Sequence, residues 1–81
     1  MSREQVIERV TEIFCDVMDL DEIELKDETT ADDVEEWDSL SHVRLIVSVE
    51  KSYSIKFSNA EISELGRFGD LIDGILAKAA T

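Results

Sequence analysis

The chain of 81 residues contains no proline, one cysteine and one histidine. One cysteine cannot form a disulfide within the chain, and Cys15 and His42 cannot supply the four ligands of an ordinary Cys/His zinc site. We therefore expect no metal site of this kind and, by default, a reducing cytoplasmic location. Bases are scarce too, because 8 Lys and Arg stand against 20 Asp and Glu, for a net charge of −12. This composition argues against nucleic-acid binding, which rewards clustered bases.

Long apolar runs are also missing. Met1 is followed by polar residues at positions 2–5, so we expect neither a signal peptide nor a membrane-spanning segment. The length fits one domain over residues 1–81, and we expect it to be a monomer. Its charge suits encounters with basic surfaces on partner proteins, although solubility alone is an alternative explanation.

Apolar residues recur at helical spacing, and no segment alternates as a strand would. The pattern predicts an all-α fold, a four-helix bundle with a long first loop and a short third helix. The helices are expected over about residues 3–18, 39–53, from a cap at 58 through 65, and 68–79. In the second helix the apolar stripe comprises Leu40, Val43, Ile46, Val47 and Val49.

Capping signals mark the helix ends. Asp38 is placed to cap the second helix, and Ser58 with Glu61 forms a capping box for the third. Gly66 is expected at the C′ position that ends the third helix. Gly74 weakens the last helix by about 1 kcal/mol relative to alanine. Cys15 is expected to be a small buried residue of the first helix.

Residues 19–38 form no convincing helix, and so long a loop in a compact domain is usually functional or disordered. The loop is acidic, but it lacks the glycine that an EF-hand needs, so a solvated acidic loop is favoured and weak divalent-ion binding stays open. Trp37 could face a ligand, but packing of the loop end is the commoner role. The expected loop anchors are Leu20, Ile23, Leu25, Val34 and Trp37.

Ser39 is the most informative residue. It lies at a predicted helix N-terminus, where free backbone N–H groups and the helix dipole favour an attached anion. Ser39 and His42 share a helix face, which would fit a hydrolase, but no Gly-x-Ser-x-Gly elbow or acid to orient the histidine accompanies them. So small a chain also has little room for a substrate pocket. We therefore interpret Ser39 as a covalent attachment point in a protein that is not an enzyme.

The segment Asp38-Ser39-Leu40 resembles the attachment motif of the acyl carrier proteins and of the related peptidyl and aminoacyl carrier domains. The resemblance extends over nearly the whole chain, through the apolar positions after Ser39, the segment 55–57 and the segment 68–72. It implies that Ser39 receives 4′-phosphopantetheine from coenzyme A through a phosphopantetheinyl transferase. It also implies that a loading ligase or transferase adds an acyl or aminoacyl group as a thioester, and that downstream biosynthetic enzymes use it.

The chain departs from carriers of fatty acid synthesis, which usually show an acidic second helix. His42, Arg44 and Lys51 interrupt that acidic face, although Glu50 remains, and Trp37 argues against an origin in a modular peptide synthetase. A discrete carrier for a specialised pathway is therefore favoured. The alternatives are a general fatty-acid carrier and a carrier-like interaction module without the arm. The expected docking residues are Asp38, Leu40, His42, Arg44, Glu50 and Lys51.

Overall fold

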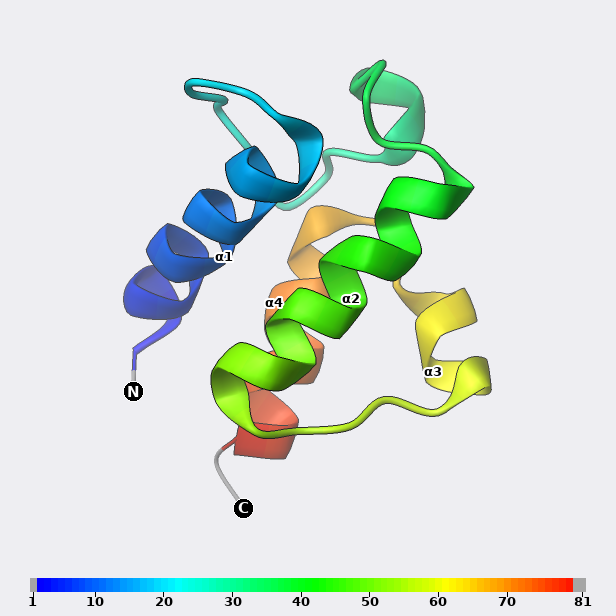
Figure 1. The fold of residues 1–81 in the computed structure, drawn as a ribbon. Helices are drawn as coiled ribbons and strands as arrows, with labels where there is room; N and C mark the ends of the chain where they lie inside the picture. The colour runs from blue at the N-terminus through cyan, green and yellow to red at the C-terminus, as the bar shows by residue number, and fades with distance from the viewer. Residues whose placement is uncertain (1, 80–81) are drawn as a thin grey trace.

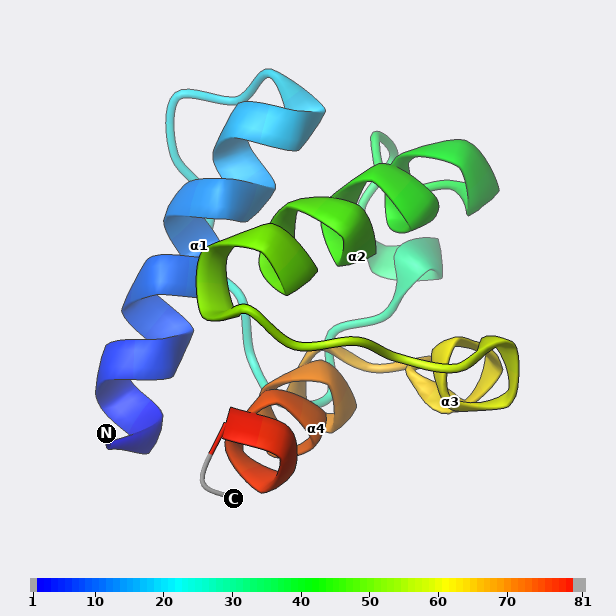
Figure 2. The same ribbon diagram turned by 60° about the horizontal axis from the view of Figure 1, so that its bottom comes forward.

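The structure is a computed structural model that describes residues 2–79. It confirms the predicted all-α bundle, in which α1 and α2 pack together, α4 packs against α1, and the short α3 lies at the periphery (Figures 1 and 2). The connection between α1 and α2, expected to lack helix, contains one short 3-10 turn. The elements are α1 (Arg3–Met18), the turn η1 (Ala31–Asp33), α2 (Ser39–Tyr53), α3 (Asn59–Glu64) and α4 (Phe68–Ala79).

The core lies between α1, α2 and α4. Phe14 of α1 and Phe68 of α4 are completely buried, and among residues 2–79 no polar or charged side chain is buried. Such a core is stabilised by apolar burial alone, at roughly 25 cal/mol per Å² of apolar surface. The fully buried aliphatic side chains belong to Val6, Val10, Leu45, Ile46, Val49, Leu71, Ile72 and Ile75.

The structure of the second helix corrects the prediction that its apolar residues form a single stripe. Leu45, Ile46 and Val49 are buried, but three of the other apolar residues of α2 are exposed: Leu40 by 66%, Val43 by 53% and Val47 by 41%. Apolar residues cover a wide sector of this helix, so periodicity could not separate the core face from a second apolar face.

Helix ends follow the predicted caps with one exception. Asp38 caps α2 and the Ser58–Glu61 capping box opens α3. The third helix ends at Glu64 rather than at 65, and Gly66, although at C′, has no positive φ. The left-handed caps are instead Asp19, with φ 57°, and Ser54, with φ 56°. Short polar side chains tolerate this conformation better than most residues.

The long connection is held firmly where it passes the start of α4. The backbone N–H of Phe68 donates to the carbonyl of Thr29 at 2.8 Å, and the N–H of Gly69 donates to the carbonyl of Asp27 at 3.0 Å. A Cβ on Gly69 would lie only 2.9 Å from the Cβ and the carbonyl oxygen of Asp27. Glycine is therefore required for this close approach.

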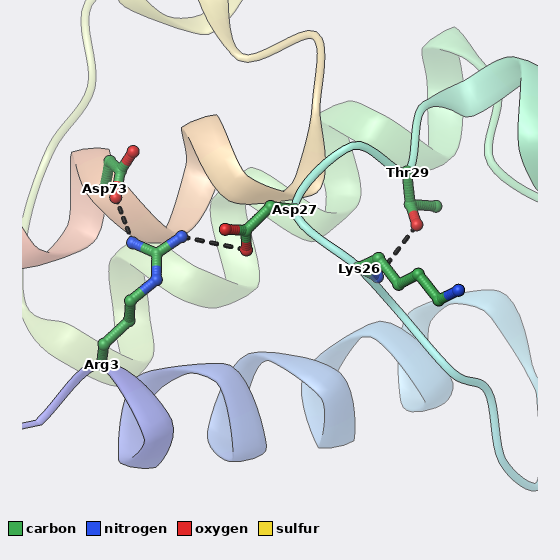
Figure 3. A network of polar contacts seen from close by, with 5 residues as sticks. All are labelled: Arg3, Lys26, Asp27, Thr29 and Asp73. Carbon is green, nitrogen blue, oxygen red and sulfur yellow. Dashed lines mark hydrogen bonds and ion pairs between the residues drawn. The ribbon is translucent and has the colours of Figure 1, made fainter.

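An ion-pair cluster strengthens the same junction (Figure 3). The guanidinium of Arg3 bridges Asp27 of the connection, at 3.0 Å, and Asp73 of α4. Beside it, the backbone N–H of Lys26 donates to the hydroxyl of Thr29 at 2.9 Å. Three distant parts of the chain thus meet at one side of the bundle.

The expected loop anchors are confirmed. Val34 and Trp37 are buried, and Leu20, Ile23 and Leu25 pack partly buried against the core.

The presence of Gly74 within α4 is also explained, because a Cβ there would lie 3.1 Å from the ring of Phe57. In residues 2–79 no helix is both long enough and apolar enough to cross a bilayer.

Candidate functional site

Ser39 is the first residue of α2 and is exposed. The helix start beneath it is fixed by a reciprocal capping box. The Asp38 carboxylate accepts from the backbone N–H of Ser41 at 2.9 Å, and the Ser41 hydroxyl accepts from the N–H of Asp38 at 2.8 Å. Within residues 2–79 we find no hydrogen bond made by the Ser39 hydroxyl, so this oxygen is accessible on a rigid support.

The capping interaction also controls the charge of Asp38. Hydrogen bonds from the backbone N–H and from the hydroxyl of Ser41 lower the pKa of Asp38. The carboxylate is therefore ionised and committed to the helix start. Asp38, expected as a docking residue, has a structural partner within the chain.

Trp37 anchors the end of the connection in the core, as predicted. Its side chain is 3% exposed and packs edge-on against Phe14, with ring centroids 5.3 Å apart. Its indole N–H donates to Nδ1 of His42 at 3.1 Å. This hydrogen bond was not predicted from the sequence, since the two residues lie five apart and only one of them is in the helix. The sequence offered one hint, because these residues are its single tryptophan and its single histidine.

This contact bears on the hydrolase alternative. In a serine hydrolase an acid accepts from the histidine Nδ1–H and orients the ring. Here Nδ1 of His42 is itself an acceptor, and its partner is an indole rather than a carboxylate. The pair formed by Ser39 and His42 therefore lacks the acid that orients the histidine in a catalytic triad.

A shallow hollow of about 360 Å³ adjoins Ser39, between the start of α2 and α3. Its size lies at the lower end of small-molecule sites, and its open form suits a flexible group mounted at its rim. An attached phosphate at Ser39 would lie at a helix N-terminus, and an apolar extension would find apolar walls. The lining residues are Ala31, Trp37, Asp38, Ser39, His42, Ile62, Ser63, Leu65 and Gly66.

The exposed side of α2 carries the other expected docking residues. Leu40, Val43 and Val47 form its apolar stripe, and Arg44 and Lys51 are exposed beside it. In the part of the chain that the structure describes, we find no ion pair made by Arg44 or Lys51. We call these five residues the α2 face.

Glu50 has a different environment from its neighbours on the α2 face. It is half-buried, and its carboxylate accepts from the backbone N–H of Phe57 at 2.8 Å. Glu50 thus fastens the segment after α2 to the helix. Its carboxylate is therefore partly engaged within the chain.

Two further predictions concern Cys15 and the acidic loop. Cys15 is half-buried rather than buried, and desolvation raises the pKa of its thiol, which disfavours the reactive thiolate. Over residues 2–79 no group of three or more His, Cys, Asp or Glu side chains is arranged to hold a metal ion. The loop carboxylates are exposed or engaged with Arg3 and the backbone.

Comparisons with known proteins agree with this geometry. The family model described as "Phosphopantetheine attachment site" matches residues 8–75. The acyl carrier protein of Tropheryma whipplei (strain Twist) is 32% identical over 99% of this chain and 98% of its own length. That of Clostridium acetobutylicum is 32% identical over 89% and 94%. The solution NMR structure of holo acyl carrier protein from Geobacter metallireducens superimposes with a TM-score of 0.86 at 47% identity, covering 93% of this chain and 86% of that one.

Proposed function

The chain belongs to the acyl carrier protein family, whose members are carriers rather than enzymes and bear a covalent 4′-phosphopantetheine, and we propose that this group is attached to Ser39. The observation that carries the proposal is the exposed hydroxyl at the first residue of α2, beside the hollow. When attached, the group supplies a flexible arm with a terminal thiol that holds acyl cargo as a thioester.

The chain's own residues have supporting roles in this proposal. Asp38 and Ser41 fix the first turn of α2, so a phosphopantetheinyl transferase meets Ser39 in a constant position. The backbone dipole at the helix start stabilises the phosphodiester. Ile62 and Leu65 provide apolar surface in the hollow, which would shelter an apolar part of the arm from water.

We propose further that the carrier serves a specialised acyl or aminoacyl pathway rather than general fatty acid synthesis. The support is the α2 face, where Arg44 and Lys51 adjoin the exposed apolar stripe of a chain with net charge −12. Such a face fits a partner with an apolar centre and acidic side chains opposite the two bases. Loading enzymes with a basic patch would be repelled by Arg44 and Lys51. The expected setting is a cytoplasmic monomer.

Intact-mass spectrometry tests the attachment. Incubation with coenzyme A and a broad-specificity phosphopantetheinyl transferase is expected to add one arm to the wild-type chain and none to Ser39→Ala. Ser63→Ala is the matched control, because Ser63 lines the same hollow and its hydroxyl donates to the carbonyl of Asn59. It is expected to gain one arm. An unmodified wild-type chain, under conditions that modify a second carrier protein, would refute the proposal.

A further inference from the structure

The hydrogen bond between Trp37 and His42 fixes where the imidazole carries its proton. An indole N–H can only donate, so Nδ1 of His42, 3.1 Å away, must be unprotonated. The neutral ring therefore carries its proton on Nε2. The chain's single tryptophan thus selects the tautomer of its single histidine.

The core holds this arrangement in place. Trp37 is 3% exposed and packs edge-on against the fully buried Phe14, so its indole cannot turn away without disturbing the core. His42 lies three residues after Ser39, and side chains at this spacing share one helix face. Both residues line the same hollow.

The polar groups of the hollow leave one side-chain donor for a ligand. Asp38 is an acceptor only, the indole N–H of Trp37 is used by His42, and the Ser63 hydroxyl donates to the carbonyl of Asn59 at 3.1 Å. Ser39 loses its own hydroxyl proton when it is esterified. In the part of the chain that the structure describes, Nε2–H of His42 is the remaining side-chain donor of the lining, and we find no protein partner for it.

From this we propose that His42 is a positioning residue, which donates its Nε2–H to the phosphodiester on Ser39 while Trp37 holds the imidazole in the donating state. The inference rests on the proposed attachment at Ser39. It gives the anion a neutral donor near the Asp38 carboxylate, so that the first segment of the arm is held over the hollow. The competing explanation is that His42 only satisfies the buried indole N–H.

Three variants separate these roles. His42→Gln keeps an oxygen that can accept from the indole and an amide N–H₂ that can donate, whereas His42→Leu lacks both groups. Trp37→Phe keeps an aromatic ring against Phe14 but removes the donor that selects the tautomer. Each variant is converted to the holo form and checked by intact mass before any spectrum is recorded.

The measurements are the ³¹P resonance of the phosphodiester and long-range ¹H–¹⁵N spectra of the imidazole, at one mildly alkaline pH. In the wild type we expect the Nε2 signal to move between apo and holo forms and the Nε2 proton to exchange more slowly in the holo form. We expect the ³¹P resonance to be displaced in His42→Leu, largely restored in His42→Gln, and displaced by a smaller amount in Trp37→Phe.

The outcomes distinguish the role of His42 from the attachment at Ser39. Identical imidazole spectra in apo and holo wild type, with one ³¹P position in all variants, would overturn the role of His42 and leave the attachment intact. The role of His42 is also overturned if His42→Leu lowers only the melting temperature. Failure to gain mass at Ser39 would overturn both the attachment and the inference built on it.

Discussion

The two ends of the connection between α1 and α2 are built in different ways. Near residues 27–29 the chain is tied to α4 by two backbone hydrogen bonds and to Arg3 by an ion pair, and Gly69 allows the contact. Near residues 37–39 the buried indole of Trp37 and the capping box of Asp38 hold the chain. The side chain of Ser39, which follows them, is exposed. We call these regions the anchored end and the open end.

This difference separates stability from function. A change that disturbs the two hydrogen bonds of the anchored end must move backbone, because main-chain atoms make these bonds on both sides. Changes at the open end and on the α2 face affect exposed side chains, where substitutions usually alter stability by less than about 0.5 kcal/mol. The comparison therefore predicts that the two regions respond to mutation in different assays.

The largest effect on stability is expected for Gly69→Ala. The new Cβ would lie 2.9 Å from Asp27 backbone and side-chain atoms, so the connection must shift and the hydrogen bond between Gly69 and Asp27 must weaken. Overpacking of this kind costs about 2–3 kcal/mol, which would lower the melting temperature by roughly 10 °C or more in a domain of this size.

Gly66→Ala is the matched control for this measurement. No heavy atom lies within 4 Å of a Cβ built on Gly66, and its φ is not positive. Thermal melts followed by circular dichroism are expected to show little change or a small gain. Equal losses in both variants would mean that glycine matters here for flexibility rather than for the close approach to Asp27.

A charge reversal on the α2 face tests the open region. Holo protein carrying Arg44→Glu or Lys51→Glu is expected to accept malonyl groups from a fatty acid synthase malonyl transferase better than wild type does. The expected rise in kcat/KM is about tenfold, equivalent to about 1.4 kcal/mol, because a like-charge contact is removed. The melting temperature is expected to stay nearly constant.

Lys26→Glu is the control for net charge, because Lys26 lies in the connection and its side chain points away from the Arg3 cluster (Figure 3). It adds the same negative charge as Arg44→Glu without changing the α2 face. If wild-type holo protein is already an efficient substrate, or if Lys26→Glu improves transfer equally, then Arg44 and Lys51 do not determine the choice of partner.

The capping carboxylate offers a smaller, pH-dependent test. The pKa of Asp38 is lowered by hydrogen bonds from Ser41, so folding favours its ionised form. The stability it contributes is complete above the unfolded pKa of about 3.9 and is lost as the pH falls through the lower folded value. Asp38→Asn keeps a capping oxygen without the charge, so we expect its deficit in melting temperature to shrink below about pH 4. A deficit that is constant with pH would show that capping geometry, not charge, is responsible.

Much of the fold could be predicted because local signals agree with tertiary packing. The N-cap at Asp38 and the capping box at Ser58 are short-range features, and the core stripe of α1 follows its helical period. Exposure of Val43 and Val47 could not be predicted, since their chemistry is that of core residues. For Leu40 the apolar pattern gave no sign of exposure, and only the resemblance, through its expected docking role, implied it. The tertiary neighbours of α2 decide which apolar side is covered.

For the candidate site too, the local feature could be predicted from the sequence and the tertiary surroundings could not. Ser39 was found from its place at a helix start, but its surroundings depend on contacts between distant residues. The hollow needs α3 beside α2, and the tautomer of His42 needs an indole that is itself held by Phe14 of α1. The left-handed caps at Asp19 and Ser54 were not predicted, because glycine is the usual residue in this conformation and neither position carries one.

The smallest effect on the melting temperature is expected from salt. It compares the ion pairs of the anchored end with the repulsion among carboxylates on the rest of the surface. The molecule measures 33 × 25 × 22 Å and carries a net charge of −12, while screening acts over about 10 Å at 0.1 M salt. Repulsion among distant carboxylates is therefore relieved by modest salt, and we expect the melting temperature to rise from low to moderate ionic strength.

Salt also weakens attractions that oppose this trend, among them the bridge from Arg3 to Asp27 and Asp73. In Arg3→Gln the bridge is gone and two more carboxylates are left uncompensated, so its melting temperature is expected to start lower and rise more steeply with salt than that of the wild type. Melts across a sodium chloride series measure both slopes. If the wild-type curve is flat or falls while the Arg3→Gln curve rises, the ion pairs of the anchored end outweigh net repulsion. If the two slopes are equal, the Arg3 bridge contributes little, and the anchored end depends on its backbone hydrogen bonds and on the fit of Gly69 against Asp27.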